Sequence, residues 1–372
     1  MTEDIISKII NECRKFTANE IRKTCLDADF SPDAGWVFGI WEKSCQLDLP
    51  FLAIPELFQG GGCTPLECAI ILDLLAGECA GMASVYAHHF TACIPLLMAD
   101  DERQNRFFAK LTDKNTLSKI AAVIFPPESG DSSLQWIKKS GHIIINGTSQ
   151  ITGSIELADG FILFLTETGD SEKTQCVWVD RSAKGVATGE SLQLPGLKIN
   201  AFGPVLFNDV KITNDNIIAN GQTAQKMLKA TRSVFYGFTA ALAVGAARRA
   251  FEKAMDYAKE RYQFGKQIIQ HQEIRRLLGN MHMKLTAGSA AYRQAFEDQK
   301  SKLSFWVTDA VPAKIFCTDA AMEIVMDAIQ IHGGYGYMHE YGIEKIMRDV
   351  KILQLLGGTN SFLAVSHIAG KI

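Results

Sequence analysis

Two runs of residues in the last third of the chain have types and spacing that suit ligand binding. The first contains Arg261, Phe264 and Gly265, followed by Ile268 and Gln272. A guanidinium beside the backbone amides of a helix start suits a phosphate or pyrophosphate group. The same residues are also typical of a glycine that ends a helix after a solvated arginine in its last turn. Both interpretations stay open from these residues alone.

The second run reads Gln330-Ile331-His332-Gly333-Gly334. Adjacent glycines let another backbone or a ligand approach closely, although they are equally compatible with a turn that ends a helix. The run is not a G-x-G-x-x-G fingerprint, and no predicted strand precedes it, so a Rossmann nucleotide site is excluded.

Three compositional zones must position these two runs. Residues 1 to 116 have helical hydrophobic spacing, residues 117 to 220 contain short runs rich in Ile, Val and Phe, and residues 221 to 372 return to long helical patterns. We therefore predict a mainly α protein with a β middle domain, and three domains with these boundaries. The predicted strands, expected to pair antiparallel, are 121–125, 143–145, 161–165, 176–179, 205–207 and 210–212.

The composition excludes several classes of protein. Hydrophobic residues make up 47% of the chain and charged residues 21%, which excludes a disordered or fibrous protein. A net charge of −3 gives no basic face, so no nucleic-acid partner is expected. The nine cysteines are an odd number without a C-x-x-C pair, which indicates reduced thiols and a cytoplasmic protein. Cys63 and Cys68 have no histidine nearby, so no metal site is expected.

The segment from Cys79 to Ala99 carries no formal charge and is long enough to cross a bilayer. Glu78 and Asp100 flank it, so the positive charge that usually borders a membrane span is missing. We therefore expect a buried helix here and no membrane span.

Taken together, the two runs resemble the signature stretches of the acyl-CoA dehydrogenase family, R-x-x-F-G-x-x-I-x-x-x-Q and Q-x-x-G-G-x-G-Y. The front of the chain adds weaker matches. Ile54-Pro55-Glu56 with the glycines at 60–62 resembles the family's "iPEeyGG" turn, and residues 122–131 align without gaps on its "ALTEPgaGSD" segment. The resemblance covers nearly the whole chain and is most specific in the last third.

The resemblance implies an N-terminal α domain, a β-barrel-like domain and a C-terminal four-helix bundle. It also implies an FAD site shared between subunits, hence a homo- or hetero-oligomer, either dimer or tetramer. The substrate would be an acyl-CoA or acyl-carrier thioester, and an electron-transfer flavoprotein would be a possible acceptor. The cofactor-binding residues carried over from the family are Arg261, Phe264, Gln272, Gln330, Gly333, Gly334, Thr359, Asn360 and Thr152.

The chain departs from the family where the catalytic base is expected. The usual base is the Glu of an E-G-T triplet, and here the triplet reads Gly357-Gly358-Thr359. Some members place the Glu near the start of the helix that leads into the Arg261 run, but counting back gives Phe235 or Thr231. Neither is a carboxylate, so the resemblance predicts a divergent member without the usual catalytic Glu.

The flavin end of the site is also altered. In the aligned segment, Ile124 replaces a flavin-contacting Thr, Phe125 replaces an acid and Gly130 replaces a Ser. Gln150 stands where the family has an indole. The tail of the cofactor site is predicted to be kept, and its reactive end to be rebuilt.

His88 and His89 are candidates for a replacement base, because they lie on the apolar segment that the resemblance places along the acyl pocket. Burial would keep an imidazole neutral, which suits a proton acceptor. The alternative is an interior histidine with satisfied hydrogen bonds and no chemical role.

The sequence therefore predicts an FAD-dependent oxidoreductase that resembles acyl-CoA dehydrogenases and oxidises a CH–CH bond of an acyl thioester with a non-standard or displaced base. Two alternatives stay open. One is a non-catalytic subunit of a hetero-oligomeric acyl-CoA dehydrogenase, and the other is a flavin-dependent oxygenase or oxidase on the same scaffold.

Overall fold

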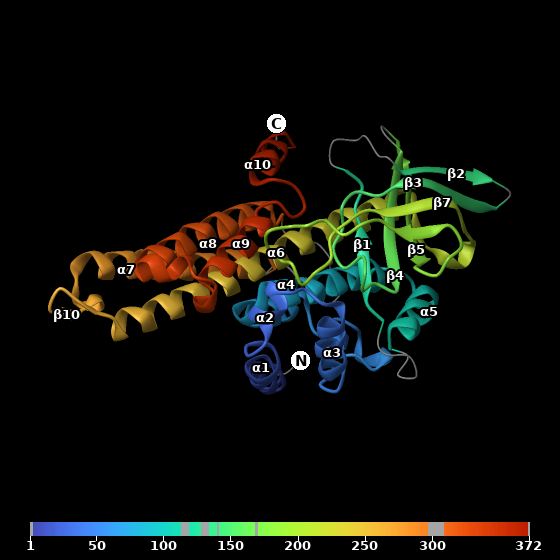
Figure 1. Cartoon of the computed structure of the whole chain (residues 1–372). Coiled ribbons are helices and arrows are strands. Elements are labelled where there is room, and N and C mark those ends of the chain that lie inside the picture. Colours follow the sequence, from blue (N-terminus) through green and yellow to red (C-terminus); the bar gives the residue numbers. More distant parts are fainter. Residues whose placement is uncertain are drawn as a thin grey trace.

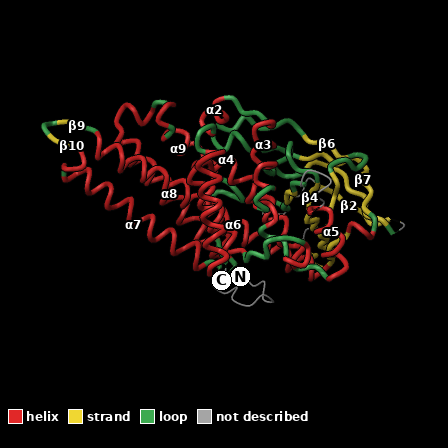
Figure 2. Tube along the Cα trace, turned by 90° about the horizontal axis from the view of Figure 1, so that it is seen from below, coloured by secondary structure: helices red, strands yellow, loops and turns green. Residues whose placement is uncertain are grey.

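The computed structural model describes residues 3–112, 119–127, 134–139, 141–167, 170–296 and 309–370. Helices lead into a β region and helices follow it, so the predicted mainly α fold with a β middle is confirmed (Figure 1). Figures 1 and 2 both place the β strands at one end of the molecule and the β9–β10 hairpin (Tyr262–Gln263 and Lys266–Gln267) at the other.

The N-terminal part is built of helices around one long central helix, α4. Thr64 begins α4 with a reciprocal cap, in which its side chain accepts from the Glu67 amide while the Glu67 carboxylate accepts from the Thr64 amide. At Cys79 the backbone leaves helical geometry (φ −155°, ψ 103°), which kinks α4. The helices of this part are α1 (Glu3–Phe16), α2 (Cys25–Phe30), α3 (Ala34–Cys45), α4 (Pro65–Leu97) and α5 (Asp101–Thr112).

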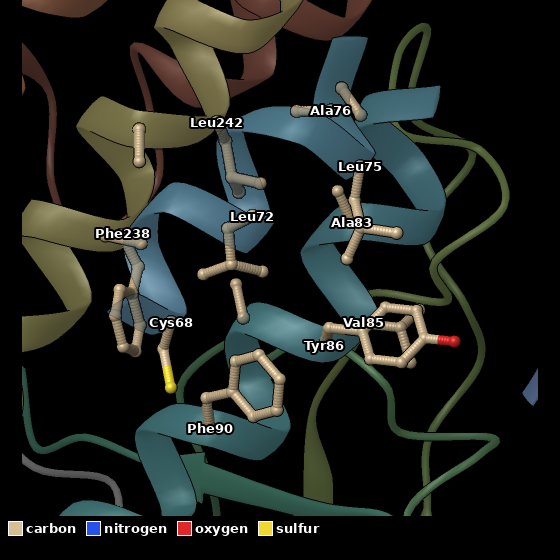
Figure 3. Close-up of a cluster of buried hydrophobic side chains, with 14 of the residues drawn as sticks. Cys68, Leu72, Leu75, Ala76, Ala83, Val85, Tyr86, Phe90, Phe238 and Leu242 are labelled. Atoms are coloured by element: carbon tan, nitrogen blue, oxygen red, sulfur yellow. The ribbon is translucent and has the colours of Figure 1, made fainter. Parts of the chain in front are cut away.

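The predicted buried helix at residues 79–99 is confirmed as the second half of α4. The whole of α4 is long and apolar enough to cross a membrane, but 83% of its apolar 18-residue stretch is buried inside the protein. It packs against α6 (Gly221–Glu260), and the side chains between them form the core shown in Figure 3, where Leu72 lies near Phe238 and Leu242. α4 is therefore a core helix.

The β region consists of two four-stranded sheets, ordered β1-β4-β5-β8 and β2-β3-β7-β6. Their facing side chains form a second core, in which Ile124, Ile145 and Phe161 are buried. The strands are β1 (Ala121–Ile124), β2 (Leu134–Lys139), β3 (His142–Thr148), β4 (Gly160–Glu167), β5 (Asp170–Asp180), β6 (Val186–Thr188), β7 (Val205–Ile212) and β8 (Ile217–Asn220).

The expectation of purely antiparallel pairing is wrong for one pair of strands, because β1 and β4 are parallel. The chain leaves β1, builds β2 and β3 in the other sheet, and only then returns beside β1, which gives the long crossover that parallel pairing requires. The strands predicted at 205–207 and 210–212 are one strand, β7. β2, β6 and β8 were not predicted at all.

Four C-terminal helices, α6, α7 (Gln272–Gln294), α8 (Val311–His332) and α9 (Ile343–Leu353), pack against one another, and α10 (Asn360–Ala369) lies against α8. α6 and α4 approach so closely that a Cβ at Gly245 would lie 2.1 Å from the Asp73 carbonyl oxygen. This close approach lets a polar network form across the helix interface.

Asp73 of α4 is the centre of that network. Its carboxylate pairs with Arg248 of α6 and accepts a 3.0 Å hydrogen bond from the Tyr292 hydroxyl of α7. Asp73 is buried and Tyr292 is fully enclosed, so the carboxylate has little access to water that could replace these partners. One side chain thus fixes three helices against each other.

We expect Asp73→Asn to lower the free energy of unfolding by roughly 2 kcal/mol, because Arg248 loses its buried counter-charge. The matched control is Glu102→Gln, which makes the same chemical change in an exposed pair with Arg106 (Glu102 side chain 79% exposed) and should cost no more than about 0.5 kcal/mol. Urea unfolding of both variants measures the difference, and equal stability would contradict a structural role for Asp73.

Candidate functional site

A cavity of about 500 Å³ lies where α4, the β region, α6 and the segment after α9 meet. Most of its lining is apolar or aromatic, with a few polar groups, which is typical of a small-molecule site. It is lined by His88, Val123, Phe125, Pro126, Pro127, Gln150, Ile151, Thr152, Gly153, Leu192, Leu194, Phe202, Arg232, Phe235, Tyr236, Ile352, Leu355, Leu356, Gly357, Gly358 and Phe362.

Gly357, where the sequence predicts that the usual base is missing, lines this cavity. Its φ of +70° lies in the left-handed region that favours glycine. A Cβ at this position would lie 2.6 Å from a ring carbon of Tyr236, and the Tyr236 hydroxyl donates a 3.0 Å hydrogen bond to the Gly357 carbonyl. The Tyr236 ring therefore fills the space that a side chain at 357 would enter.

Lys314 of α8 holds the turn that carries Gly357 through three hydrogen bonds. Its ammonium donates to the carbonyl oxygens of Gln354 (2.8 Å) and Gly358 (2.9 Å), and to the side-chain oxygen of Asn360 (2.7 Å). Lys314 is completely buried, and burial lowers its pKa to about 8. Lys314 thus fixes the turn that forms part of the cavity wall, and these three contacts are called the Lys314 clamp below.

His88 lines the cavity from α4. Its Nδ1 lies 2.7 Å from the Ser84 carbonyl oxygen, so Nδ1 carries the hydrogen and the neutral ring has a bare lone pair on Nε2. A Cβ built on Gly153 would lie 2.6 Å from that Nε2, which places the lone pair beside a residue that also lines the cavity. Burial lowers the pKa of His88 to about 4, so the ring is neutral at pH 7.

His89 is turned away from the described lining of the cavity. Its Nδ1 accepts a hydrogen bond from the Ala121 amide at 3.2 Å, and its ring packs edge-on against Trp41. Burial also lowers the pKa of His89 to about 4. Of the two neighbouring histidines, His89 has the surroundings of an interior structural residue.

Two polar residues of the cavity were missed by the sequence reasoning, Arg232 and Tyr236 of α6. Arg232 donates to the Pro126 carbonyl oxygen at 2.8 Å and lies 5.6 Å from the centre of the Phe125 ring. Their spacing in the sequence could have indicated that they act together, since residues four apart lie on one face of a helix. Lys314 was also missed, because a single lysine at the start of an apolar helix belongs to no motif.

The other residues that the sequence predicts to be altered at the flavin end of the site do not all line the cavity. Phe125 lines the cavity, whereas Ile124 is buried in the core between the two sheets. Gln150 and Thr152 both line the cavity, and the Thr152 hydroxyl donates to the Val123 carbonyl oxygen at 2.7 Å. Gly130 lies outside the described residues.

The residues at the second position where the resemblance predicts a base are also not carboxylates. Phe235 lines the cavity, and Thr231 is buried with its hydroxyl bonded to the Met227 carbonyl oxygen. No Asp or Glu occurs among the lining residues within the described ranges. His88 is the imidazole that the described chain brings to this cavity.

Thr359 and Asn360 follow the cavity turn directly. The Thr359 hydroxyl caps α10 by accepting from the Phe362 amide, and the Asn360 amide group donates to Thr318 and Asp319. Their side chains thus hold the turn in place, while Gly358 and Phe362 on either side line the cavity.

The remaining predicted cofactor residues gather at the far end of α6. The Arg261 guanidinium lies 5.7 Å from the centre of the Tyr335 ring, which joins the first run to the second. Phe264 at the tip of the β9–β10 hairpin is 91% exposed, and a Cβ at Gly333 or Gly334 would meet nothing within 4 Å. Gln272 and Gln330 are exposed there as well.

The two groups of residues are separated by the length of α6, as Figure 1 shows for the hairpin and the β region. Tyr236 at the cavity and Arg261 at the hairpin are about 37 Å apart, at about 1.5 Å per helical residue. This exceeds the reach of one dinucleotide. The described chain therefore presents the predicted cofactor residues as two separate groups, which are called half-sites below.

Family models match both helical parts of the chain. The model described as acyl-CoA dehydrogenase, N-terminal domain, matches residues 6–115, and the one described as acyl-CoA dehydrogenase, C-terminal domain, matches residues 223–369. The chain belongs to the acyl-CoA dehydrogenase family. It is accordingly an oxidoreductase of the acyl-CoA dehydrogenase type, and the cofactor of this family is FAD.

Similar proteins agree over nearly the full length. An acyl-CoA dehydrogenase of Bacillus subtilis is 27% identical over 87% of this chain and 86% of its own. The CarC subunit of the caffeyl-CoA reductase–Etf complex of Acetobacterium woodii is 27% identical over 93% of each chain. The structure of butyryl-CoA dehydrogenase from Megasphaera elsdenii superposes with a TM-score of 0.88 at 24% identity, covering 98% of this chain and 97% of that chain.

The half-sites fit a flavin dinucleotide in their chemistry. The hairpin end offers a guanidinium, an exposed aromatic ring and an open pair of glycines, which suit a pyrophosphate and an adenine. The cavity end offers enough apolar space for a planar ring or an acyl chain, with the Thr152 hydroxyl on its wall. The residues present are thus compatible with FAD.

Stability should fall in mild acid because of the buried histidines. Between pH 6.5 and pH 4 the unfolded chain binds a proton at His89 that the folded chain excludes. Each unit by which the pH falls within this range therefore lowers the free energy of unfolding by about 1.4 kcal/mol. His89→Asn keeps an acceptor for the Ala121 amide but does not titrate. Urea unfolding from pH 7 to pH 5 should therefore show a shallower decline for this variant than for the native chain, and identical slopes would contradict the assignment.

Proposed function

We propose that this protein oxidises a CH–CH bond of an acyl thioester with FAD, and that His88 accepts the substrate proton in place of the missing carboxylate. The observation that carries the proposal is the cavity itself. It combines an apolar lining, a glycine at the expected base position and one imidazole with a bare nitrogen directed at the lining.

His88 meets the requirements of a general base. The hydrogen bond from Nδ1 to the Ser84 carbonyl fixes the tautomer, so the acceptor nitrogen is always Nε2. Its pKa of about 4 is close to the value of an ordinary glutamate, so the imidazole is no weaker a base than the carboxylate it would replace. It is also unprotonated throughout the neutral range.

The aromatic walls orient the substrate around this base. The His88 ring lies between Phe202 and Phe235, with ring centres 5.7 and 5.5 Å away. Such walls exclude water from the proton acceptor and bind the acyl chain by apolar contact. When bound, FAD supplies the two-electron acceptor for the hydrogen that leaves the neighbouring carbon.

The active site is completed by a second subunit in this proposal. Arg261, Phe264, Gln330 and the Gly333–Gly334 turn bind the dinucleotide tail of the cofactor whose ring lies in a neighbour's cavity. Support comes from the distance along α6 and from the exposure of Phe264 in the single chain. The second subunit is either another copy of this chain or a homologue, and we propose a homo-oligomer because this chain carries both half-sites.

The relatives and the thiols support a proposed electron acceptor and a proposed location. The CarC relative is a subunit of a complex with Etf, which supports an electron-transfer flavoprotein as the acceptor. All nine cysteines are free thiols, which supports a reducing, cytoplasmic setting. The proposed substrate class is an acyl thioester of CoA or of a carrier protein. It is supported by relatives named as acyl-CoA dehydrogenases and by a structural neighbour named as an acyl carrier protein oxidase.

The lack of an Asp or Glu among the described lining residues also supports a second candidate function. If this chain only supplies the tail-binding half-site to an active homologue, the cavity needs no base and His88 is structural. The purified protein would then bind little FAD, whereas the proposed enzyme holds FAD and loses its visible colour when a suitable acyl-CoA is added.

His88→Gln should reduce acyl-CoA-dependent dye reduction by about 10²- to 10⁴-fold while FAD stays bound, because the proton acceptor is lost. His89→Asn is the matched control, since it removes the adjacent buried imidazole outside the cavity lining and should change the rate less than about threefold. In the native enzyme the acid limb of the pH–rate profile should lie near 4 and not near 6.5. Equal rates for the two variants would remove His88 from the mechanism.

Phe264→Ala should lower FAD retention at least tenfold, because the exposed ring binds the cofactor tail of a neighbouring subunit. The matched control is Leu57→Ala, which truncates another exposed apolar side chain (84% exposed) far from the hairpin in sequence. Neither change removes core packing, so thermal unfolding of the flavin-free protein should be unaltered in both. Unchanged flavin content in Phe264→Ala after gel filtration would contradict a shared site.

A further inference from the structure

Two cysteines meet at the kink of α4, away from the cavity described above. Cys25 is the first residue of α2, and Cys79 is the residue at which the α4 backbone leaves helical geometry. Both thiols are buried, and both line a small cavity of about 60 Å³. A space of this size is large enough for a few water molecules or for a small peroxide.

The two sulfur atoms are neighbours. The Cys25 sulfur lies 3.4 Å from the carbonyl oxygen of Glu78, in the peptide group that leads directly into Cys79, and both cysteines line the same small cavity. Cys79 receives two contacts, from the Met82 amide at 3.5 Å and from the Lys345 ammonium at 3.9 Å. A thiol with this many donors is stabilised as a thiolate.

The walls of the small cavity add positive charge. Arg22, Arg249, Lys253 and Lys345 line it, against Glu78 and Asp349 as acids. The neighbouring Cys25 thiol and the Lys345 charge together lower the pKa of Cys79 to about 7, despite its burial. The other cysteines whose pKa is shifted are all raised, mainly by burial or by a neighbouring thiol. The pKa of Cys79 is thus shifted in the opposite direction from the pKa values of these interior thiols.

We propose that Cys25 and Cys79 form a peroxide-sensitive pair that closes to a disulfide between α2 and α4. The Cys79 thiolate attacks one oxygen of a hydroperoxide, the O–O bond breaks, and the leaving oxygen takes a proton to depart as water or an alcohol. The Cys25 thiol then attacks the resulting sulfenic acid, the S–S bond forms, and the hydroxyl leaves with the Cys25 proton as water. Two thiols lose two electrons, and the hydroperoxide gains them.

The kink at Cys79 makes the closure sterically feasible. Because Cys79 is not in helical geometry, its sulfur can adjust toward Cys25 without breaking a continuous run of helical hydrogen bonds. The bond would join residues 25 and 79 and restrict the unfolded chain, so the oxidised protein should be more stable than the reduced one.

The experiment is a titration of the native holoenzyme with hydrogen peroxide from one to ten equivalents, followed by non-reducing peptide mass spectrometry. We expect a cross-linked pair containing Cys25 and Cys79, lighter than the two free peptides by two hydrogen atoms and released by dithiothreitol. The thermal midpoint should rise by several degrees on oxidation and return on reduction. Cys25→Ser should leave Cys79 as a sulfenic acid that a dimedone probe traps.

A second pair of thiols provides an internal control. Cys63 and Cys68 are also both buried, but the charges that act on Cys68 all raise its pKa. At a peroxide dose that half-oxidises Cys25 and Cys79, the Cys63–Cys68 pair should be oxidised at least tenfold more slowly. Equal rates for the two pairs, no cross-link at Cys25 and Cys79, or a Cys79–Lys345 cross-link that has gained an oxygen would each overturn the proposal. These outcomes do not depend on the function of the large cavity.

Discussion

The buried ion pair between Lys345 and Asp349 in α9 connects all three parts of the chain. The two side chains are 2.6 Å apart and almost fully enclosed, and Asp349 also accepts the Leu197 amide of the β region at 2.6 Å. Lys345 reaches Cys79 of α4 from the same position. An unpaired charge at this depth would cost several kcal/mol, so neither residue is replaceable alone.

Arg348, which lies between these two residues in α9, makes a similar set of contacts. It pairs with Asp29 at the end of α2 at 2.7 Å and donates to the Pro195 carbonyl oxygen of the β region at 2.6 Å. α9 is therefore fixed between the N-terminal helices and the sheets before its chain enters the cavity turn. The position of Gly357 depends on this anchoring on one side and on the Lys314 clamp on the other.

The sequence predicts those features that local pattern determines. Helical and strand periodicity gives the order of helices, β region and helices, and the two runs at Arg261 and Gln330 indicate the hairpin end of the site. Periodicity does not determine which sheet a strand joins, so the parallel β1–β4 pair was missed. Nor does it separate His88 from His89, because a rotation of about 100° along the helix decides which of two adjacent rings reaches the cavity. The spacing of Arg232 and Tyr236 places them on one helix face, but only tertiary packing brings that face to the cavity. Lys314 becomes a candidate only through its contacts with the cavity turn.

The glycine at 357 is part of a rebuilt cavity wall and not an isolated loss. The Tyr236 ring lies where a side chain at 357 would project, and its hydroxyl bonds to the glycine's own carbonyl. A carboxylate at 357 would need a residue in left-handed geometry and the removal of that ring, which are two separate costs. The tyrosine, the glycine and the lysine clamp therefore depend on each other. A wall with such mutual dependence favours a proton acceptor elsewhere in the cavity, which supports the proposal that His88 of α4 is that acceptor.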